Sequence, residues 1–99
     1  MKKTRSEITR LLEQNRDAIR KFGVRSLALF GSAVRDEATD ASDLDFVVEF
    51  THKTFDNYMG LKFFLEDLLQ SKVDLVIRET IKPRLRDEIL SSAIHAPGL

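Results

Sequence analysis

The segment Asp43-Leu44-Asp45-Phe46-Val47-Val48 begins with two acidic residues and continues into an apolar run. Phenylalanine and valine are common in strands, so the segment predicts a buried β-strand over residues 45–50. Residues two apart in a strand point to the same face, about 6.5–7 Å apart. Asp43 and Asp45 are therefore expected to aim their carboxylates into a common space. Like charges so placed need a counter-charge, which a divalent cation such as Mg²⁺ supplies through oxygen ligands.

A Gly-Ser pair precedes this strand, in the stretch Leu29-Phe30-Gly31-Ser32-Ala33. The pattern predicts a strand over residues 24–30 that ends at Gly31-Ser32, before a short helix over residues 33–37. Glycine lets the backbone approach a ligand closely, and the free N–H groups of a helix N-terminus favour phosphate. Ser32 adds a hydroxyl donor. Gly-Ser turns are common, so this feature alone is only a weak indication of a phosphate site.

A third acidic residue, Asp74, lies within the apolar stretch Val73-Asp74-Leu75-Val76-Ile77. A carboxylate in such a strand is costly to bury unless it is paired or bound to a metal. Each acid taken alone also fits a surface position on an edge strand or in a turn. Three aspartates on two predicted strands, next to a Gly-Ser turn, together indicate metal-assisted phosphoryl or nucleotidyl transfer.

The remaining pattern predicts an α+β fold, with a small sheet of about three strands flanked by about four helices. Further helices are expected over residues 6–22 with Ser6 as N-cap, over 55–70 and over 82–93, and a third strand over 73–77. The helix over 55–70 is apolar around most of its circumference, which suits either a central core helix or one that also contacts a partner. The tail over 96–99 is expected to fray. The length of 99 residues predicts one domain over residues 1–99.

Composition narrows the classes of function. The chain has 16 Lys and Arg against 16 Asp and Glu, and a net charge of zero argues against direct nucleic-acid binding. A single nucleoside triphosphate remains compatible, because it needs only a local positive field and a metal. No run of about 18 apolar residues predicts a membrane span. The absence of cysteine excludes a disulfide framework and favours a cytoplasmic location.

Gly31-Ser32, followed after ten residues by Asp43-Leu44-Asp45, matches the signature of the DNA polymerase β-like nucleotidyltransferase superfamily. The wider strings over residues 29–38 and 42–48 resemble the minimal nucleotidyltransferases of prokaryotes, in which a third aspartate lies in a Val-Asp-Leu-Val strand like that of Asp74. The resemblance covers nearly the whole chain. It implies a mixed sheet with flanking helices and a site for two Mg²⁺ ions.

By this resemblance, Asp43 and Asp45 hold both metal ions and the triphosphate. Asp74 holds the catalytic metal and helps to deprotonate the acceptor hydroxyl. Two cations about 3.5–4 Å apart would stabilise the attacking and leaving oxygens of an in-line displacement.

The resemblance also implies that Gly31 and Ser32 bind the β- and γ-phosphates of the nucleotide. Arg35 belongs to the same pattern, and it either contacts phosphate or braces the acidic loop. The motif residues bind only phosphates and metal, so they do not define the base of the nucleotide. ATP as the donor and AMP as the transferred group are therefore implied by the resemblance to the family alone.

Small proteins of this kind are often antitoxins paired with a HEPN-type ribonuclease toxin. The implied function is adenylylation of a toxin hydroxyl, such as that of a tyrosine, within a hetero-oligomer or by a homodimer. One alternative is a non-catalytic antitoxin that neutralises its partner by docking. Another is a small-molecule nucleotidyltransferase, although such enzymes usually carry an additional acceptor-binding domain, which 99 residues do not accommodate unless dimerisation compensates.

Overall fold

The computed structural model describes residues 4–31, 34 and 43–99. These residues contain a four-stranded sheet in the order β3-β2-β1-β4, together with four α-helices. β1 is antiparallel to both of its neighbours, whereas β2 and β3 are parallel. The strands are β1 (Val24–Phe30), β2 (Leu44–Phe50), β3 (Val73–Ile77) and β4 (Ile94–His95). The helices are α1 (Arg5–Gln14), α2 (Arg16–Arg20), α3 (Phe55–Leu69) and α4 (Pro83–Ser92), and a 3₁₀ turn, η2, covers Arg78–Thr80.

The predicted α+β class with a mixed sheet is confirmed, and the predicted short helix over residues 33–37 lies largely outside the described residues.

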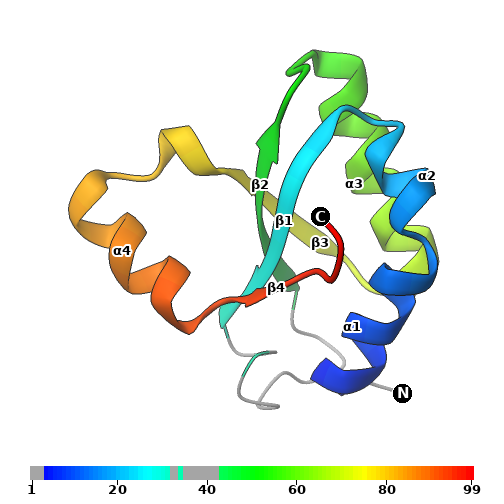
Figure 1. Cartoon of the computed structure of the whole chain (residues 1–99), viewed down its shortest axis with the longest axis horizontal. Coiled ribbons are helices and arrows are strands. Elements are labelled where there is room, and N and C mark those ends of the chain that lie inside the picture. The colour runs from blue at the N-terminus through cyan, green and yellow to red at the C-terminus, as the bar shows by residue number, and fades with distance from the viewer. Residues whose placement is uncertain (1–3, 32–33, 35–42) are drawn as a thin grey trace.

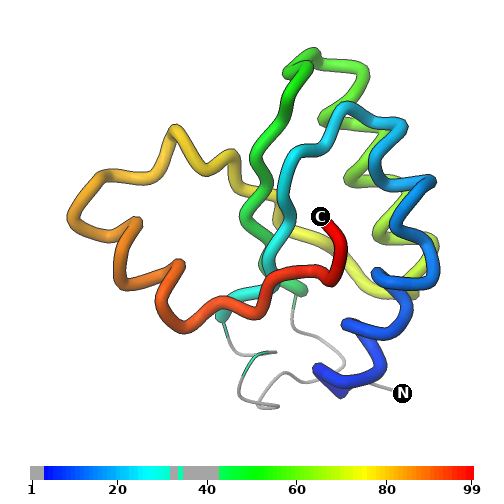
Figure 2. The backbone as a smooth tube through the Cα atoms, in the orientation of Figure 1, coloured from blue at the N-terminus to red at the C-terminus, as the bar shows by residue number. Residues whose placement is uncertain are grey.

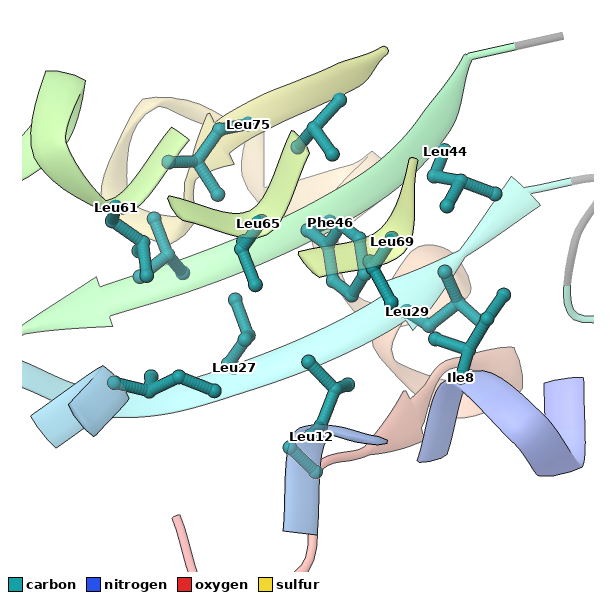
Figure 3. Close-up of a cluster of buried hydrophobic side chains, with 14 of the residues drawn as sticks. Ile8, Leu12, Leu27, Leu29, Leu44, Phe46, Leu61, Leu65, Leu69 and Leu75 are labelled. Carbon is teal, nitrogen blue, oxygen red and sulfur yellow. The ribbon is translucent and has the colours of Figure 1, made fainter. Parts of the chain in front are cut away.

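The two faces of the sheet have different surroundings. Helices α1, α2 and α3 lie on one side of it and α4 lies on the other (Figure 1). On β2, Leu44, Phe46 and Val48 belong to the core cluster that the sheet shares with α1 and α3 (Figure 3). Because side chains alternate along a strand, Asp45 and Glu49 face the opposite side, away from these three helices.

The start of α1 is fixed by a capping box. The Thr4 hydroxyl accepts a hydrogen bond from the Glu7 N–H at 3.2 Å, and the Glu7 carboxylate accepts one from the Thr4 N–H at 3.4 Å. Two backbone donors of the first turn are satisfied in this way. The prediction that Ser6 caps the helix was wrong, since Ser6 lies inside α1.

The single helix predicted over residues 6–22 is divided into α1 and α2 at Asn15. The Asn15 side-chain amide donates to the Leu11 carbonyl at 2.8 Å, and its backbone leaves the helical region at φ −111° and ψ 18°. Asparagine offers the backbone this kind of local alternative to a continuous helix. The apolar spacing continues across the break, which is why periodicity alone did not reveal it.

Helix α3 contributes one continuous stripe to the core. Leu61, Leu65 and Leu69, four residues apart, are each at most 1% exposed. Phe55 and Phe63 point elsewhere and are 77% and 58% exposed. The prediction that this helix packs in the core is therefore confirmed for one face of α3, while apolar side chains on other faces are exposed to solvent. No helix among the described residues is long and apolar enough to cross a membrane.

Side chains of α3 cover the outer edge of β3. The Tyr58 hydroxyl donates to the Leu75 carbonyl at 2.6 Å, and the Glu66 carboxylate accepts from the Val73 N–H at 3.0 Å. The hydrogen bond from Val73, followed by that from Lys62, lowers the pKa of Glu66 below its ordinary value. Engaging edge groups in this way discourages pairing with another strand.

The fourth strand was not predicted. Ile94 and His95 pair with Leu29 and Ala28 of β1, and the next residue, Ala96, donates its N–H to the Leu27 carbonyl at 2.8 Å. Leu99 packs against the core cluster, so the predicted fraying of the tail was also wrong. A strand of two residues has no hydrophobic periodicity to read.

Gln70 and Gly23 both adopt positive φ, at 54° and 75°. Glycine accepts this conformation without strain, whereas other residues do not. We expect Gln70→Gly to raise the free energy of unfolding by about 0.5–1 kcal/mol, because relief of strain exceeds the loss of an exposed side-chain bond.

The matched substitution Gly23→Ala should lower the free energy of unfolding by more than about 1 kcal/mol, since its new Cβ would add a collision to the strain. That Cβ would lie 2.9 Å from Asn57 Nδ2 and 3.0 Å from the His52 carbonyl oxygen. Urea unfolding of both variants measures the pair. Changes of the same sign would contradict the assigned backbone conformations.

Candidate functional site

The end of β1 lies directly against Asp45. Phe30, the last residue of β1, pairs with Asp45 of β2, and Gly31 follows with φ 81°. A Cβ atom on Gly31 would lie 2.5 Å from Asp45 Oδ2 and 3.3 Å from its Cγ. From the sequence, we predicted that the missing side chain of Gly31 lets a ligand approach the backbone. In the structure, the Asp45 carboxylate lies in the space that a side chain at this position would fill. Any larger residue would displace that carboxylate.

Three acidic residues meet at the same end of the sheet. Asp45 and Asp74 are register partners on the parallel strands β2 and β3, and Asp43 precedes Asp45 by two residues. The Leu44 N–H donates to the Lys72 carbonyl at 2.9 Å, which keeps the starts of the two strands level. The end of β1 and the start of β2 lie together in the lower part of Figure 2. The antiparallel β1 thus brings Gly31 to the end of the sheet where the carboxylates lie.

The carboxylates interact electrostatically. Asp45 is half-buried, whereas Asp43 and Asp74 are exposed. Burial raises the pKa of Asp45 above its ordinary value, and the negative charges of Asp74 and then Asp43 raise it further. The charges of Asp43 and Asp74 therefore contribute to the proton affinity of Asp45, although less than its burial does.

Glu49 provides a contrast on the same strand and the same face. It lies within 3.9 Å of the Arg25 guanidinium and 3.7 Å of the Arg78 guanidinium, so two cations offset its charge. In the part of the chain that the structure describes, Asp43, Asp45 and Asp74 form no such ion pair. Among the described residues, no cation therefore offsets the negative charge at the start of β2.

The donor chemistry of this site fits a hard divalent cation. Carboxylate oxygens are the ligands that Mg²⁺ prefers. The pKa of Asp45 is raised mainly by burial, and the negative charges of Asp74 and Asp43 add to this. Within the described residues, however, no three His, Cys, Asp or Glu side chains are arranged closely enough to hold a metal ion. The residue types therefore suit a metal site, but the carboxylates of the described residues are not close enough together to coordinate one ion.

The structure brings together four of the six predicted site residues: Gly31, Asp43, Asp45 and Asp74. The other two, Ser32 and Arg35, lie outside the described residues. Sequence reasoning also did not predict the contact of Arg5, whose Nη1 donates to the Val34 carbonyl at 3.0 Å. No local pattern could have revealed a contact between residues 29 apart in sequence.

Comparison with known proteins finds relatives that cover nearly the whole chain. The family model described as "Nucleotidyltransferase domain" matches residues 10–95. The protein adenylyltransferase MntA of Thermococcus cleftensis is 34% identical over 94 residues, which cover 93% of this chain and 95% of that protein.

Two solved structures share the fold. One, described as a candidate minimal nucleotidyltransferase, has a TM-score of 0.73 and 36% identity, covering 87% of this chain and 93% of that one. Another, a mutant of the toxin–antitoxin pair MntA–HpeT, has a TM-score of 0.65 and 25% identity, covering 99% of this chain and 75% of the matched one. The family model alone spans most of the sequence, from α1 to β4. The chain therefore belongs to the nucleotidyltransferase domain family.

Proposed function

We propose that this protein transfers AMP from ATP to a hydroxyl group of a toxin and thereby acts as its antitoxin. The observation that carries the proposal is the placement of Asp45 between Gly31 and Asp74, in a group of carboxylates without a cation among the described residues. The relative named MntA is a protein adenylyltransferase, and a structural neighbour is one half of a toxin–antitoxin pair. Both support this reaction and this kind of partner.

In the proposed complex, Gly31 and Ser32 bind the β- and γ-phosphates of ATP. Asp43, Asp45 and Asp74 are the residues that would hold Mg²⁺, with room in the family pattern for two ions. When bound, the metal supplies positive charge that neutralises the triphosphate and the three carboxylates. Arg35 is left with two roles, contact with phosphate or support of the acidic loop.

The reaction is an in-line displacement at the α-phosphorus. The acceptor oxygen forms a new bond to this phosphorus, and the bond from the α-phosphorus to the oxygen that bridges to the β-phosphate breaks. Pyrophosphate leaves with the electron pair of that bond. The hydroxyl proton passes to Asp74, and the products are adenylylated acceptor, pyrophosphate and a proton released later to solvent.

Exposure distinguishes the roles of the carboxylates. Asp74 is exposed, so it can meet a hydroxyl presented on the surface of another protein. Asp45 is half-buried against Gly31, which suits a group that binds the nucleotide side of the reaction. A toxin tyrosine, as in HEPN-type ribonucleases, fits this arrangement. We place the reaction in the cytoplasm, within a complex of the two proteins.

Intact-protein mass spectrometry tests the proposal. The purified chain is mixed with ATP, Mg²⁺ and the protein encoded beside its gene. We expect the partner to gain one or more AMP units. Asp45→Asn should reduce the rate roughly a hundredfold or more, the scale seen when one stabilising group is removed from a transition state. Asp17→Asn is the matched control, because Asp17 is 86% exposed on α2.

Retention of the wild-type rate by Asp45→Asn would contradict the proposed site. A stable complex without AMP transfer, in which Asp45→Asn silences the toxin as well as the wild type does, would favour a docking antitoxin. Transfer to an added small alcohol but not to the partner would favour a small-molecule transferase.

The raised pKa of Asp45 also predicts a dependence of stability on pH. A carboxyl group whose pKa is raised by folding favours the native state at low pH, and this contribution is lost as the pH rises through the raised pKa. At neutral pH and without metal, the ionised Asp45 therefore destabilises the fold.

We expect Asp45→Asn to be more stable than the wild type in urea at pH 7 with a chelator present. The difference should shrink as the pH falls toward the ordinary value of 3.8 and reverse its sign on adding Mg²⁺ with ATP, which only the wild type binds well. Asp17→Asn should stay within about 0.5 kcal/mol throughout. If Asp45→Asn is instead less stable than the wild type in the presence of the chelator, the ionised Asp45 carboxylate does not destabilise the wild-type fold.

A further inference from the structure

Phe30, the last residue of β1, lies directly opposite Asp45 of β2. Opposite residues of an antiparallel pair project from the same face, with their Cβ atoms about 4.5–5.5 Å apart. The Phe30 side chain therefore stands beside Asp45, on the side away from Asp74. We propose that Phe30 is a positioning residue, whose ring confines the Asp45 carboxylate to the space beside Gly31, where it meets the metal-bound nucleotide. This inference rests on the proposed function.

The ring of Phe30 belongs to the face of the sheet that carries the carboxylates. Side chains alternate along β1, so Phe30 faces away from Leu29, which is 1% exposed and lies in the core cluster (Figure 3). Phe30 is half-buried, yet among the described residues it is not one of the apolar side chains packed against that cluster. The core shared with α1 and α3 therefore does not account for its burial.

The backbone that carries this ring is held on both edges. On one edge, Phe30 itself pairs with Asp45. On the other edge, the preceding residue, Leu29, pairs with Ile94 of β4. The Leu29 side chain also anchors this end of β1 in the core. The ring therefore projects toward Asp45 from a fixed origin.

Apolar neighbours restrict the positions open to the Asp45 carboxylate. Val47 lies two residues further along the same face of β2 and is 3% exposed, while Phe30 stands on the β1 side. Neither side chain can donate a hydrogen bond, so a carboxylate moved against them would lose hydration without compensation. The space left by Gly31 accepts it instead, since a Cβ there would lie 2.5 Å from Asp45 Oδ2. Gly31 thus provides the space, and Phe30 closes the alternative.

Confinement of this carboxylate affects both binding and rate. A side chain that is already held in its binding position loses less conformational freedom when it receives a ligand. Without the ring, Asp45 regains rotamer freedom that nucleotide binding must remove again. Displacement of a reacting or coordinating group by about 1 Å can slow a reaction roughly a hundredfold. Removal of the ring should therefore weaken affinity and reduce the transfer rate.

Phe50 offers a matched control. It is half-buried like Phe30 and lies at the opposite end of β2 from Asp45, where it pairs with Val24. Its side chain packs against the core cluster. Truncation of Phe50 therefore removes the same ring from the sheet but leaves the neighbours of Asp45 unchanged.

The test compares Phe30→Ala, Phe30→Leu and Phe50→Ala with the wild type. Calorimetry gives the Kd for ATP with Mg²⁺ on the chain alone, the transfer assay gives kcat, and thermal unfolding gives Tm. We expect Phe30→Ala to raise the Kd roughly two- to tenfold, the cost of ordering one side chain on binding. Its kcat should fall roughly ten- to a hundredfold. Phe30→Leu should recover most of both losses, because it keeps an apolar side chain beside Asp45. Phe50→Ala should match the wild type in Kd and kcat even where its Tm is lower.

A double-mutant cycle with Asp45→Asn separates positioning of the carboxylate from general loosening of the fold. If the ring acts through this carboxylate, Phe30→Ala should change the Kd by less than about twofold in the Asp45→Asn background. If Phe30 only stabilises the fold, the change in Kd should be the same in both backgrounds. Phe30→Val, which keeps a strand-favouring residue, takes the place of Phe30→Ala in the cycle if the alanine variant does not fold.

The inference is overturned if Phe30→Ala binds ATP and transfers AMP as the wild type does, if Phe50→Ala loses as much affinity, or if the effect of Phe30→Ala is undiminished in Asp45→Asn. A wild-type chain that binds ATP but transfers nothing would contradict the proposed function, while the cycle in Kd still decides the role of Phe30. A wild-type chain that does not bind ATP would overturn both.

Discussion

Asp45 pairs with Phe30 on one side and with Asp74 on the other, and the rest of the structure depends on this double register. The register is enforced from the opposite face of β2, where Leu44 and Phe46 are buried in the core shared with α1 and α3. A slip of one residue would put Asp45 into that core and Phe46 into water. The hydrophobic core therefore holds three carboxylates at one end of the sheet against their mutual repulsion.

Much of this arrangement could be predicted from the sequence, because it follows from alternation along single strands. The apolar runs located β1, β2 and β3 to within one residue, and the spacing of Asp43 and Asp45 placed them on one face. Features that depend on one side-chain bond or on distant partners were missed. The break at Asn15 rests on one amide bond, and β4 exists only through its pairing with β1.

Two half-buried acidic residues on the same face of β2, Asp45 and Glu49, differ in how their charges are balanced. Glu49 is balanced by Arg25 and Arg78, so its charge is neutralised within the protein. Asp45 lies at the other end of that face beside a second carboxylate and a glycine, with its proton affinity raised. A fold optimised only for stability would not collect carboxylates that no cation among the described residues offsets, whereas the proposed site for a cation and a triphosphate requires them.

The most direct measurement is the pKa of Asp45 itself. It can be determined by a pH titration monitored by carboxyl ¹³C NMR, in the metal-free wild type and in Asp74→Asn. A value above the ordinary 3.8 in the wild type is predicted. It should fall in Asp74→Asn, and fall in the wild type when Mg²⁺ and a non-hydrolysable ATP analogue are added. An ordinary pKa that responds to neither Asp74→Asn nor Mg²⁺ would contradict the claim that these carboxylates form one site.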